Sequence, residues 1–132
     1  FKAATDRLVA QYNAYEALPG LKLNGEQTLG ENIADVAGLQ AAYVAYQKSL
    51  GGKPAPVIDG LSGDERFCLA YAQAWRTKMR DAALRARVIG DGHAPGRFRA
   101  LTVRNIDAWY DTFKVTDGQM LFLKPEDRVK IW

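Results

Sequence analysis

Cysteine, histidine and long apolar runs are nearly missing from this sequence of 132 residues, which contains one cysteine and one histidine. The lone Cys68 has no partner for an internal disulfide, and its neighbours Phe67 and Leu69 predict a buried thiol. No apolar run approaches the roughly 18 residues that cross a bilayer. The first residues lack the basic flank and apolar core of a signal peptide, and the chain does not begin with Met. We therefore expect a fragment or processed product that makes no membrane contact.

The composition is that of an ordinary globular protein, with 48% hydrophobic and 25% charged residues. This supplies enough apolar material for one core, so we expect residues 1–132 to form a single domain. The net charge is only +3, but basic residues concentrate between Arg76 and Arg104. Such a stripe could bind nucleic-acid phosphates, anionic lipid or an acidic peptide, or it could face solvent beside a helix end. No nucleic-acid motif accompanies it, so no nucleic-acid partner is expected.

Apolar spacing predicts a mainly α fold with at most minor strand content. Residues 2–13 fit a first helix, and the turn signals within 15–28 favour an extended segment or a small hairpin. Further helices are expected over 28–49, from 62 to about 75, over 81–88, from 105 to about 113 and for one turn near 125. The glycine-rich and proline-rich segment 90–96 should be irregular.

Capping signals set the expected helix starts. Thr28 with Glu31, and Ser62 with Glu65, have the spacing of capping boxes. Asn105 can cap a helix that begins at Ile106. The helix after Ser62 should bury one face, made of Phe67, Ala70, Tyr71, Ala74 and Trp75.

Two carboxylates, Glu31 and Asp35, stand four residues apart at the start of the second expected helix. One helical turn separates them, so they share a face and repel by a few tenths of a kcal/mol. A cation near them would offset the repulsion, and a metal ion is one candidate because a carboxylate oxygen can bind zinc. The alternative is that Glu31 only completes the capping box with Thr28. The pair by itself favours this alternative.

Two further spots can carry chemistry. Asp91 lies two residues before His93, so its carboxylate can accept the imidazole N–H and hold the ring charged, ready to stabilise an oxyanion. A surface histidine beside a loop acid is the plainer interpretation. Arg97 and Arg99 flank Phe98, and one guanidinium could bind a carboxylate or carbonyl inside a cleft. Two exposed arginines around a buried Phe98 are an equally economical alternative.

The motifs occur together and in a set order. Asn-Gly at 24–25 is followed by Thr-Leu-Gly-Glu-Asn-Ile-Ala-Asp at 28–35, and Asp-Gly-His-Ala-Pro-Gly-Arg-Phe-Arg stands at 91–99. The first resembles the Glu-x-x-x-Asp zinc-ligand motif of the neprilysin family of zinc metallopeptidases, and the second resembles that family's Asp-x-His-x-Pro-x-x-Phe-Arg motif. The terminal Trp132 also fits. The resemblance covers essentially the whole chain and implies the helical C-terminal part of a thermolysin-like catalytic domain.

This resemblance implies roles for the catalytic residues. Glu31 matches the third zinc ligand, and Asp35 matches the acid that orients a zinc-binding histidine. His93 matches the imidazole that stabilises the tetrahedral intermediate, with Asp91 as its partner. In that mechanism zinc polarises the peptide carbonyl and activates water.

The same resemblance implies how a peptide substrate would be held. Arg99 matches the arginine that binds a substrate carbonyl. Trp75 falls where the family lines the pocket for the side chain after the scissile bond. The implied activity is that of a zinc-dependent endopeptidase or oligopeptidase acting on short peptides.

The sequence departs from the family at the zinc site. The His-Glu-x-x-His helix is absent and His93 is the only histidine, whereas a catalytic zinc needs three protein ligands. We therefore expect this chain alone to bind no zinc and to be inactive, with zinc bound in a full-length protein whose upstream part completes the site. The cysteines typical of extracellular animal members are missing too, which points to a bacterial member. The resemblance further implies a location in the bacterial cell envelope, periplasmic or secreted.

The competing hypothesis is a metal-free helical module that binds a peptide or protein through His93 and Arg99. If the chain is a fragment that lacks its upstream part, a further expectation follows. Residues around Tyr43, Trp75 and the Glu31 face should leave an apolar cleft, which would favour self-association.

Overall fold

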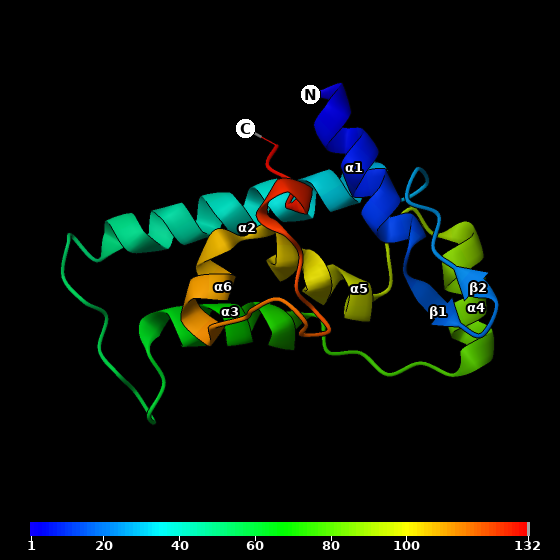
Figure 1. The fold of residues 1–132 in the computed structure, drawn as a ribbon. Helices are drawn as coiled ribbons and strands as arrows, with labels where there is room; N and C mark the ends of the chain where they lie inside the picture. Colours follow the sequence, from blue (N-terminus) through cyan, green and yellow to red (C-terminus); the bar gives the residue numbers. More distant parts are fainter. Residues whose placement is uncertain (132) are drawn as a thin grey trace.

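The computed structural model describes residues 1–131, and these form a mainly helical arrangement with one small sheet (Figure 1). The predicted fold class is confirmed. The long helix α2 runs across the molecule, with α1 crossing near its start and α3 beneath it (Figure 1). The elements are α1 (Lys2–Asn13), β1 (Glu16–Leu18), β2 (Leu21–Lys22), α2 (Leu29–Ser49), α3 (Gly63–Ala74), α4 (Asp81–Gly90), α5 (Gly96–Ala100), η1 (Leu101–Asn105), α6 (Asp107–Phe113) and η2 (Pro125–Asp127).

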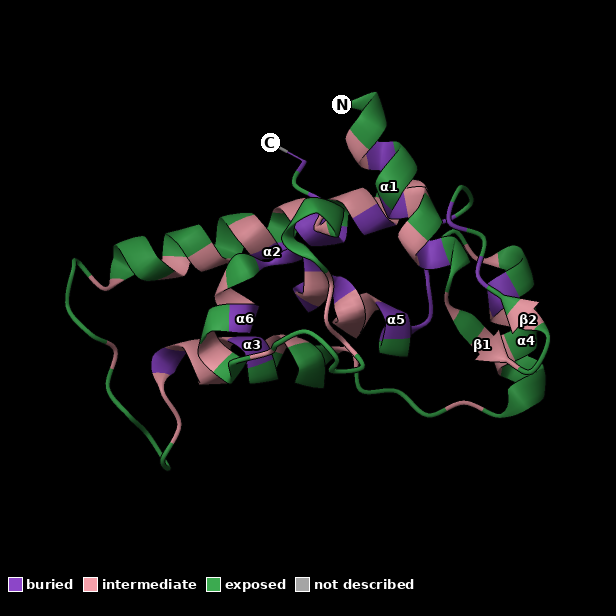
Figure 2. Cartoon of the chain, in the orientation of Figure 1, coloured by how far each residue is buried: buried purple, intermediate pink, exposed green. Residues whose placement is uncertain are grey.

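Two apolar clusters hold the helices together. The larger one joins α1, the first half of α2, α4, α5 and the C-terminal segment, and its members are Leu8, Tyr12, Leu23, Val36, Val88, Ala94, Phe98, Val129 and Ile131. The smaller one joins α2 to η1 and α6 through Leu39, Val103 and Ile106. Buried residues of α2 lie in its first half, and its second half is exposed or half-buried (Figure 2). The first half of α2 is thus fixed on several sides.

The segment after α1 forms a small hairpin, one of the two forms predicted for it. β1 and β2 pair antiparallel, with Leu18 opposite Leu21. Pro19 and Gly20 make the turn, and Gly20 has a φ of +74°, a conformation that glycine adopts without strain.

Gly25 allows the chain to pass close to α1. A Cβ atom at this position would lie 2.3 Å from the carbonyl oxygen of Val9 and 2.9 Å from its Cα. The Gly25 amide also donates to Asn13 Oδ1 at 2.7 Å, which fixes the approach to the end of α1. The turn that leads into α2 therefore depends on a residue without a side chain.

We predict that Gly25→Ala destabilises the chain by at least about 2 kcal/mol, because the backbone of α1 must move to admit the methyl group. Gly38→Ala is the matched control. Gly38 lies within α2 with nothing within 4 Å of its would-be Cβ, so alanine should raise stability by about 0.5–1 kcal/mol. Urea unfolding of both variants measures the two effects. Equal shifts in the two variants would contradict this packing.

α3 begins as predicted but is less buried than predicted. Ser62 Oγ accepts from the Glu65 amide, and the Glu65 carboxylate accepts from the Ser62 amide, so the capping box is confirmed. The expected buried face is wrong in part, because Ala70 and Ala74 are exposed and Phe67, Tyr71 and Trp75 are only half-buried. Ala70 lines an open apolar cavity of about 390 Å³ between α2 and α3, which leaves this part of the helix face uncovered. Cys68 on this helix is buried, as predicted, and burial raises the pKa of its thiol to about 11.

Two predicted caps are wrong. Thr28 precedes α2 but makes no side-chain cap bond; its Oγ1 donates to the Asn24 carbonyl and accepts from Asn32 Nδ2. Asn105 does not cap α6 either. Its amide pairs with Gln11 on α1, and its Oδ1 also accepts from the Val129 amide. Thr28 thus bonds to side-chain and carbonyl groups four residues away, and Asn105 to partners across the fold, so neither caps the first turn of the next helix with its side chain.

Candidate functional site

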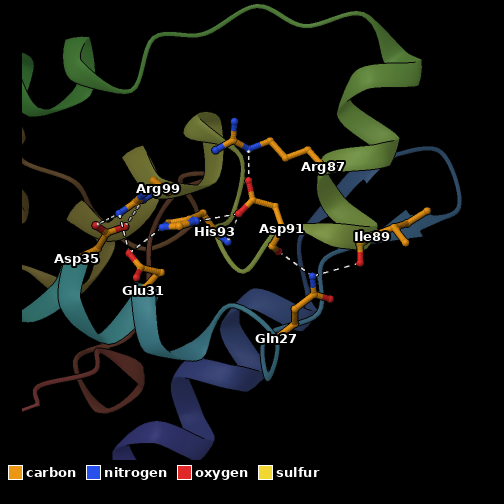
Figure 3. A network of polar contacts seen from close by, with 8 residues as sticks. All are labelled: Gln27, Glu31, Asp35, Arg87, Ile89, Asp91, His93 and Arg99. Carbon is orange, nitrogen blue, oxygen red and sulfur yellow. Dashed lines mark hydrogen bonds and ion pairs between the residues drawn. The ribbon is translucent and has the colours of Figure 1, made fainter.

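Three segments far apart in the sequence meet in one polar network (Figure 3). The start of α2 supplies Glu31 and Asp35, the irregular loop before α5 supplies Asp91 and His93, and α5 supplies Arg99. The clusters described above bring these segments together, because α2, α4 and α5 share the larger apolar core. These five residues, all singled out in the sequence, therefore form one connected set of polar contacts.

Asp35 and Arg99 form the buried part of the network. Arg99 Nε donates to Asp35 Oδ2 and Arg99 Nη2 donates to Asp35 Oδ1, each at 2.7 Å, which is a bidentate pair. The Asp35 side chain is 8% exposed and the Arg99 side chain 13%. Hydrogen bonding to Asp35 is the main cause that raises the pKa of Arg99. Arg99 is thus locked in position by a carboxylate that is itself fixed on α2.

Glu31 lies one turn earlier and faces the open side of the network. Its Oε2 lies 3.2 Å from His93 Nε2 and 3.7 Å from Arg99 Nη2. The Glu31 and His93 side chains are each 44% exposed. The predicted repulsion between Glu31 and Asp35 is therefore offset here by Arg99, which lies between the two acids. Glu31 keeps an accessible carboxylate.

His93 is oriented by Asp91, as predicted. Asp91 Oδ1 accepts from the His93 backbone amide at 2.9 Å and lies 2.8 Å from His93 Nδ1. The hydrogen bond to the His93 ring is the main cause that lowers the pKa of Asp91. A carboxylate on Nδ1 leaves Nε2 to point at Glu31 and the open side of the site.

Gln27 and Arg87 support this loop and were not singled out in the sequence. Gln27 Nε2 donates to the Asp91 carbonyl at 2.7 Å, and Arg87 Nε lies 3.4 Å from Asp91 Oδ2 (Figure 3). The spacing of four residues between Arg87 and Asp91 is a signal that could have revealed the second contact. Gln27 is too distant along the chain to be found in this way.

Arg97 and Arg99 have different surroundings. Arg99 lies inside the network, whereas Arg97 is exposed and its Cζ lies 5.6 Å from the centre of the Phe98 ring. Phe98 is buried in the larger cluster. The structure thus favours the interpretation in which one guanidinium occupies the site and the other does not.

Trp75 joins the site from the end of α3. Its ring lies beneath the Arg99 guanidinium, with 3.9 Å between Arg99 Cζ and the ring centre. Tyr71, one turn earlier, donates its hydroxyl to the Arg99 carbonyl at 3.1 Å. The predicted substrate-pocket residue is therefore in direct contact with the predicted substrate-binding arginine.

The residues of this chain fit one part of a catalytic zinc site. An accessible carboxylate such as that of Glu31 is a suitable zinc ligand. Over residues 1–131, however, no group of three or more His, Cys, Asp or Glu side chains is arranged to hold a metal ion. Glu31 can supply one ligand, but a complete set of ligands is not assembled within residues 1–131.

The sequence pattern of peptidase family M13 matches residues 1–129. The chain belongs to peptidase family M13. Its sequence is 35% identical over 136 residues to that of endothelin-converting enzyme 1 of Rattus norvegicus. It is 31% identical over 137 residues to that of neprilysin-3 of Drosophila melanogaster. All of this chain is covered in both alignments, but only 18% and 17% of those proteins. The M13 chain therefore spans less than a fifth of the length of these relatives.

Solved structures agree with this assignment. The M13 chain superposes with a TM-score of 0.95 and 48% identity on Mycobacterium tuberculosis zinc metalloprotease Zmp1 in complex with an inhibitor, covering 99% of this chain and 21% of that one. PepO of a Lactobacillus gives a TM-score of 0.80 with 32% identity, covering all of this chain and 20% of that one. The predicted family of zinc metallopeptidases is confirmed, and these two bacterial neighbours are consistent with a bacterial member.

Proposed function

We propose that this chain is a helical part of the catalytic domain of a zinc-dependent M13 endopeptidase or oligopeptidase that acts on short peptides. The observation that carries the proposal is the network that joins an accessible Glu31 to His93 and Arg99. Family membership supports the reaction class. The roles proposed for the single residues rest on their contacts.

Glu31 would be a zinc ligand. It is the most exposed acid of the network, with a side chain 44% exposed against 33% for Asp91 and 8% for Asp35, and its Oε2 lies next to His93. Asp35 would fix the surroundings of the site, because both of its oxygens are taken by Arg99. When bound, zinc would polarise the peptide carbonyl and activate water. The other zinc ligands and the general base would come from a part of the protein outside these 132 residues.

His93 would stabilise the oxyanion that develops on the attacked carbonyl. Asp91 binds Nδ1 and the backbone amide of His93, so the ring is held with Nε2 toward the site. A donor fixed in place before the reaction stabilises developing charge without reorganisation. Arg99 would bind a substrate carbonyl through Nη1, since its Nε and Nη2 already donate to Asp35.

The partner that completes the site would be the upstream part of the same protein. Apolar surface on the second half of α2 supports this proposal: one shallow cavity of about 470 Å³ is lined by Gln40, Ala41, Val44, Ala45 and Lys48. A second, of about 390 Å³, lies between α2 and α3. Expressed alone, the chain would expose these surfaces and self-associate.

Among residues 1–131, none of the helices combines the length and the apolar character that a membrane span requires.

The experiment that tests the proposal uses the full-length protein. We expect zinc to be present in the purified protein and an internally quenched peptide to be cleaved; the chelator o-phenanthroline should abolish cleavage and added zinc should restore it. The 132-residue chain, assayed beside it, should neither retain zinc nor cleave the peptide. Chelator-insensitive cleavage, or a full-length protein that binds the peptide without cleaving it, would overturn the proposal and favour a metal-free binding module.

A further inference from the structure

The contact between Trp75 and Arg99 suggests a role for Trp75 that differs from lining a pocket. Arg99 Cζ lies 3.9 Å from the centre of the Trp75 ring, so the guanidinium is stacked on the aromatic face. A second restraint on the guanidinium comes from Asp35, whose two carboxylate oxygens accept hydrogen bonds from Nε and Nη2 at 2.7 Å each. The side chain of Arg99 is therefore held in its plane by the carboxylate and across its face by the indole.

The backbone of Arg99 is held by the same helix end. Tyr71 donates its hydroxyl to the Arg99 carbonyl at 3.1 Å. Gly96, the first residue of α5, lies so close to the end of α3 that a Cβ would come within 2.5 Å of the Trp75 carbonyl oxygen and 2.9 Å of Thr77 Oγ1. This close approach brings α5 against the end of α3 and puts Arg99 over Trp75.

We propose that Trp75 is a positioning residue that acts through Arg99: its ring holds the guanidinium so that Nη1 remains directed to a ligand carbonyl. The proposal rests on the proposed peptidase function. Over residues 1–131 no hydrogen bond occupies Nη1 of Arg99, whereas Nε and Nη2 are both engaged. A fixed guanidinium loses less conformational entropy when it binds a ligand than a free one does.

A pocket wall and a positioning residue give different results in substrate kinetics. A wall touches the side chain after the scissile bond, so its loss affects peptides according to that side chain. A positioning residue acts on a backbone carbonyl that all peptides share. Its loss should raise KM by the same factor for all of them and change kcat less, because the carbonyl contact is present in ground state and transition state alike.

The test compares Trp75→Leu, Trp75→Phe and Trp109→Leu in the full-length zinc enzyme, with three peptides that differ only in having Ala, Leu or Phe after the scissile bond. Trp75→Leu keeps apolar bulk but removes the aromatic face, so KM should rise roughly twofold to thirtyfold, equally for all three peptides. Trp75→Phe keeps an aromatic face under the guanidinium, so KM should stay within about threefold. Trp109, which packs against Tyr110 and Phe113, is the control and should leave KM unchanged.

A double-mutant cycle with Arg99→Ala completes the test. If Trp75 acts through Arg99, Trp75→Leu should have no further effect on KM once the guanidinium is gone. An equal effect in both backgrounds, a KM change that depends on the substrate side chain, or a loss in Trp75→Phe as large as in Trp75→Leu would overturn the inference. A wild-type enzyme without zinc-dependent cleavage would instead overturn the proposed function itself. If the double variant fails to fold, judged by its melting curve, the peptide series alone decides between the two roles.

Discussion

Glu31→Gln is expected to remove zinc from the full-length protein and to lower its peptidase activity by at least about a hundredfold. Groups that only support metal ligands already cost about 10- to 100-fold when changed, and the loss of a ligand should cost more. Glutamine keeps the size of the side chain but removes the negative charge that binds the cation. Zinc content by atomic absorption and initial rates on one peptide measure the two effects.

The stability of Glu31→Gln separates a ligand from a structural residue. Glu31 is 44% exposed and its contacts with His93 and Arg99 lie at 3.2 and 3.7 Å. Such exposed pairs contribute at most about 1 kcal/mol to stability. The metal-free variant and the metal-free wild type should therefore have nearly the same unfolding midpoint. Glu26→Gln, an exposed acid in the preceding turn, is the control and should keep zinc and activity. Full activity in Glu31→Gln would contradict the assigned role.

Asp35→Asn, unlike Glu31→Gln, should greatly lower the free energy of unfolding. Asp35 and Arg99 are 8% and 13% exposed in their side chains, and their two hydrogen bonds measure 2.7 Å each. Removing one partner of a buried pair leaves the other charge without compensation, which costs about 3 kcal/mol. Urea unfolding of the 132-residue chain measures this loss, because zinc is not needed for the pair to form.

The control for Asp35→Asn is Asp6→Asn. Asp6 also pairs with a basic residue, Lys2, at 2.6 Å, but the two side chains are 61% and 87% exposed. Solvent screens such a pair, so little change in the unfolding midpoint is expected. If the two substitutions shift the midpoint equally, the Asp35 pair does not stabilise the fold in the way proposed.

Local signals in the sequence predicted much of this fold. The ranges of α1, α2 and α4, the small hairpin and the turn at Pro125 all follow from apolar spacing and turn residues within a few positions of one another. The capping box at Ser62 is local as well. These features could be predicted because both residues of each interaction lie close together in the sequence, within one or two turns of the chain.

The wrong cap predictions come from competing hydrogen-bond partners. Thr28 and Asn105 have the chemistry of caps, but Thr28 binds Asn24 and Asn32, each four residues away, and Asn105 binds Gln11 from 94 residues away. The pairing of Asp35 with Arg99 spans 64 residues and could not be derived from spacing. Motif order did predict which residues share the site, since Glu31, Asp35, Asp91, His93 and Arg99 all meet (Figure 3). Their catalytic roles and the cell-envelope location stay predictions.

The central claim is that this chain supplies Glu31 as one ligand to a zinc ion whose other ligands lie outside its 132 residues. A crystal structure of the full-length protein, with zinc located by anomalous scattering at its absorption edge, tests this directly. We expect the zinc peak at about 2.0–2.2 Å from a Glu31 carboxylate oxygen, with the remaining protein ligands from other parts of the protein. A zinc ion bound elsewhere, with Glu31 still paired only to His93 and Arg99, would contradict the account.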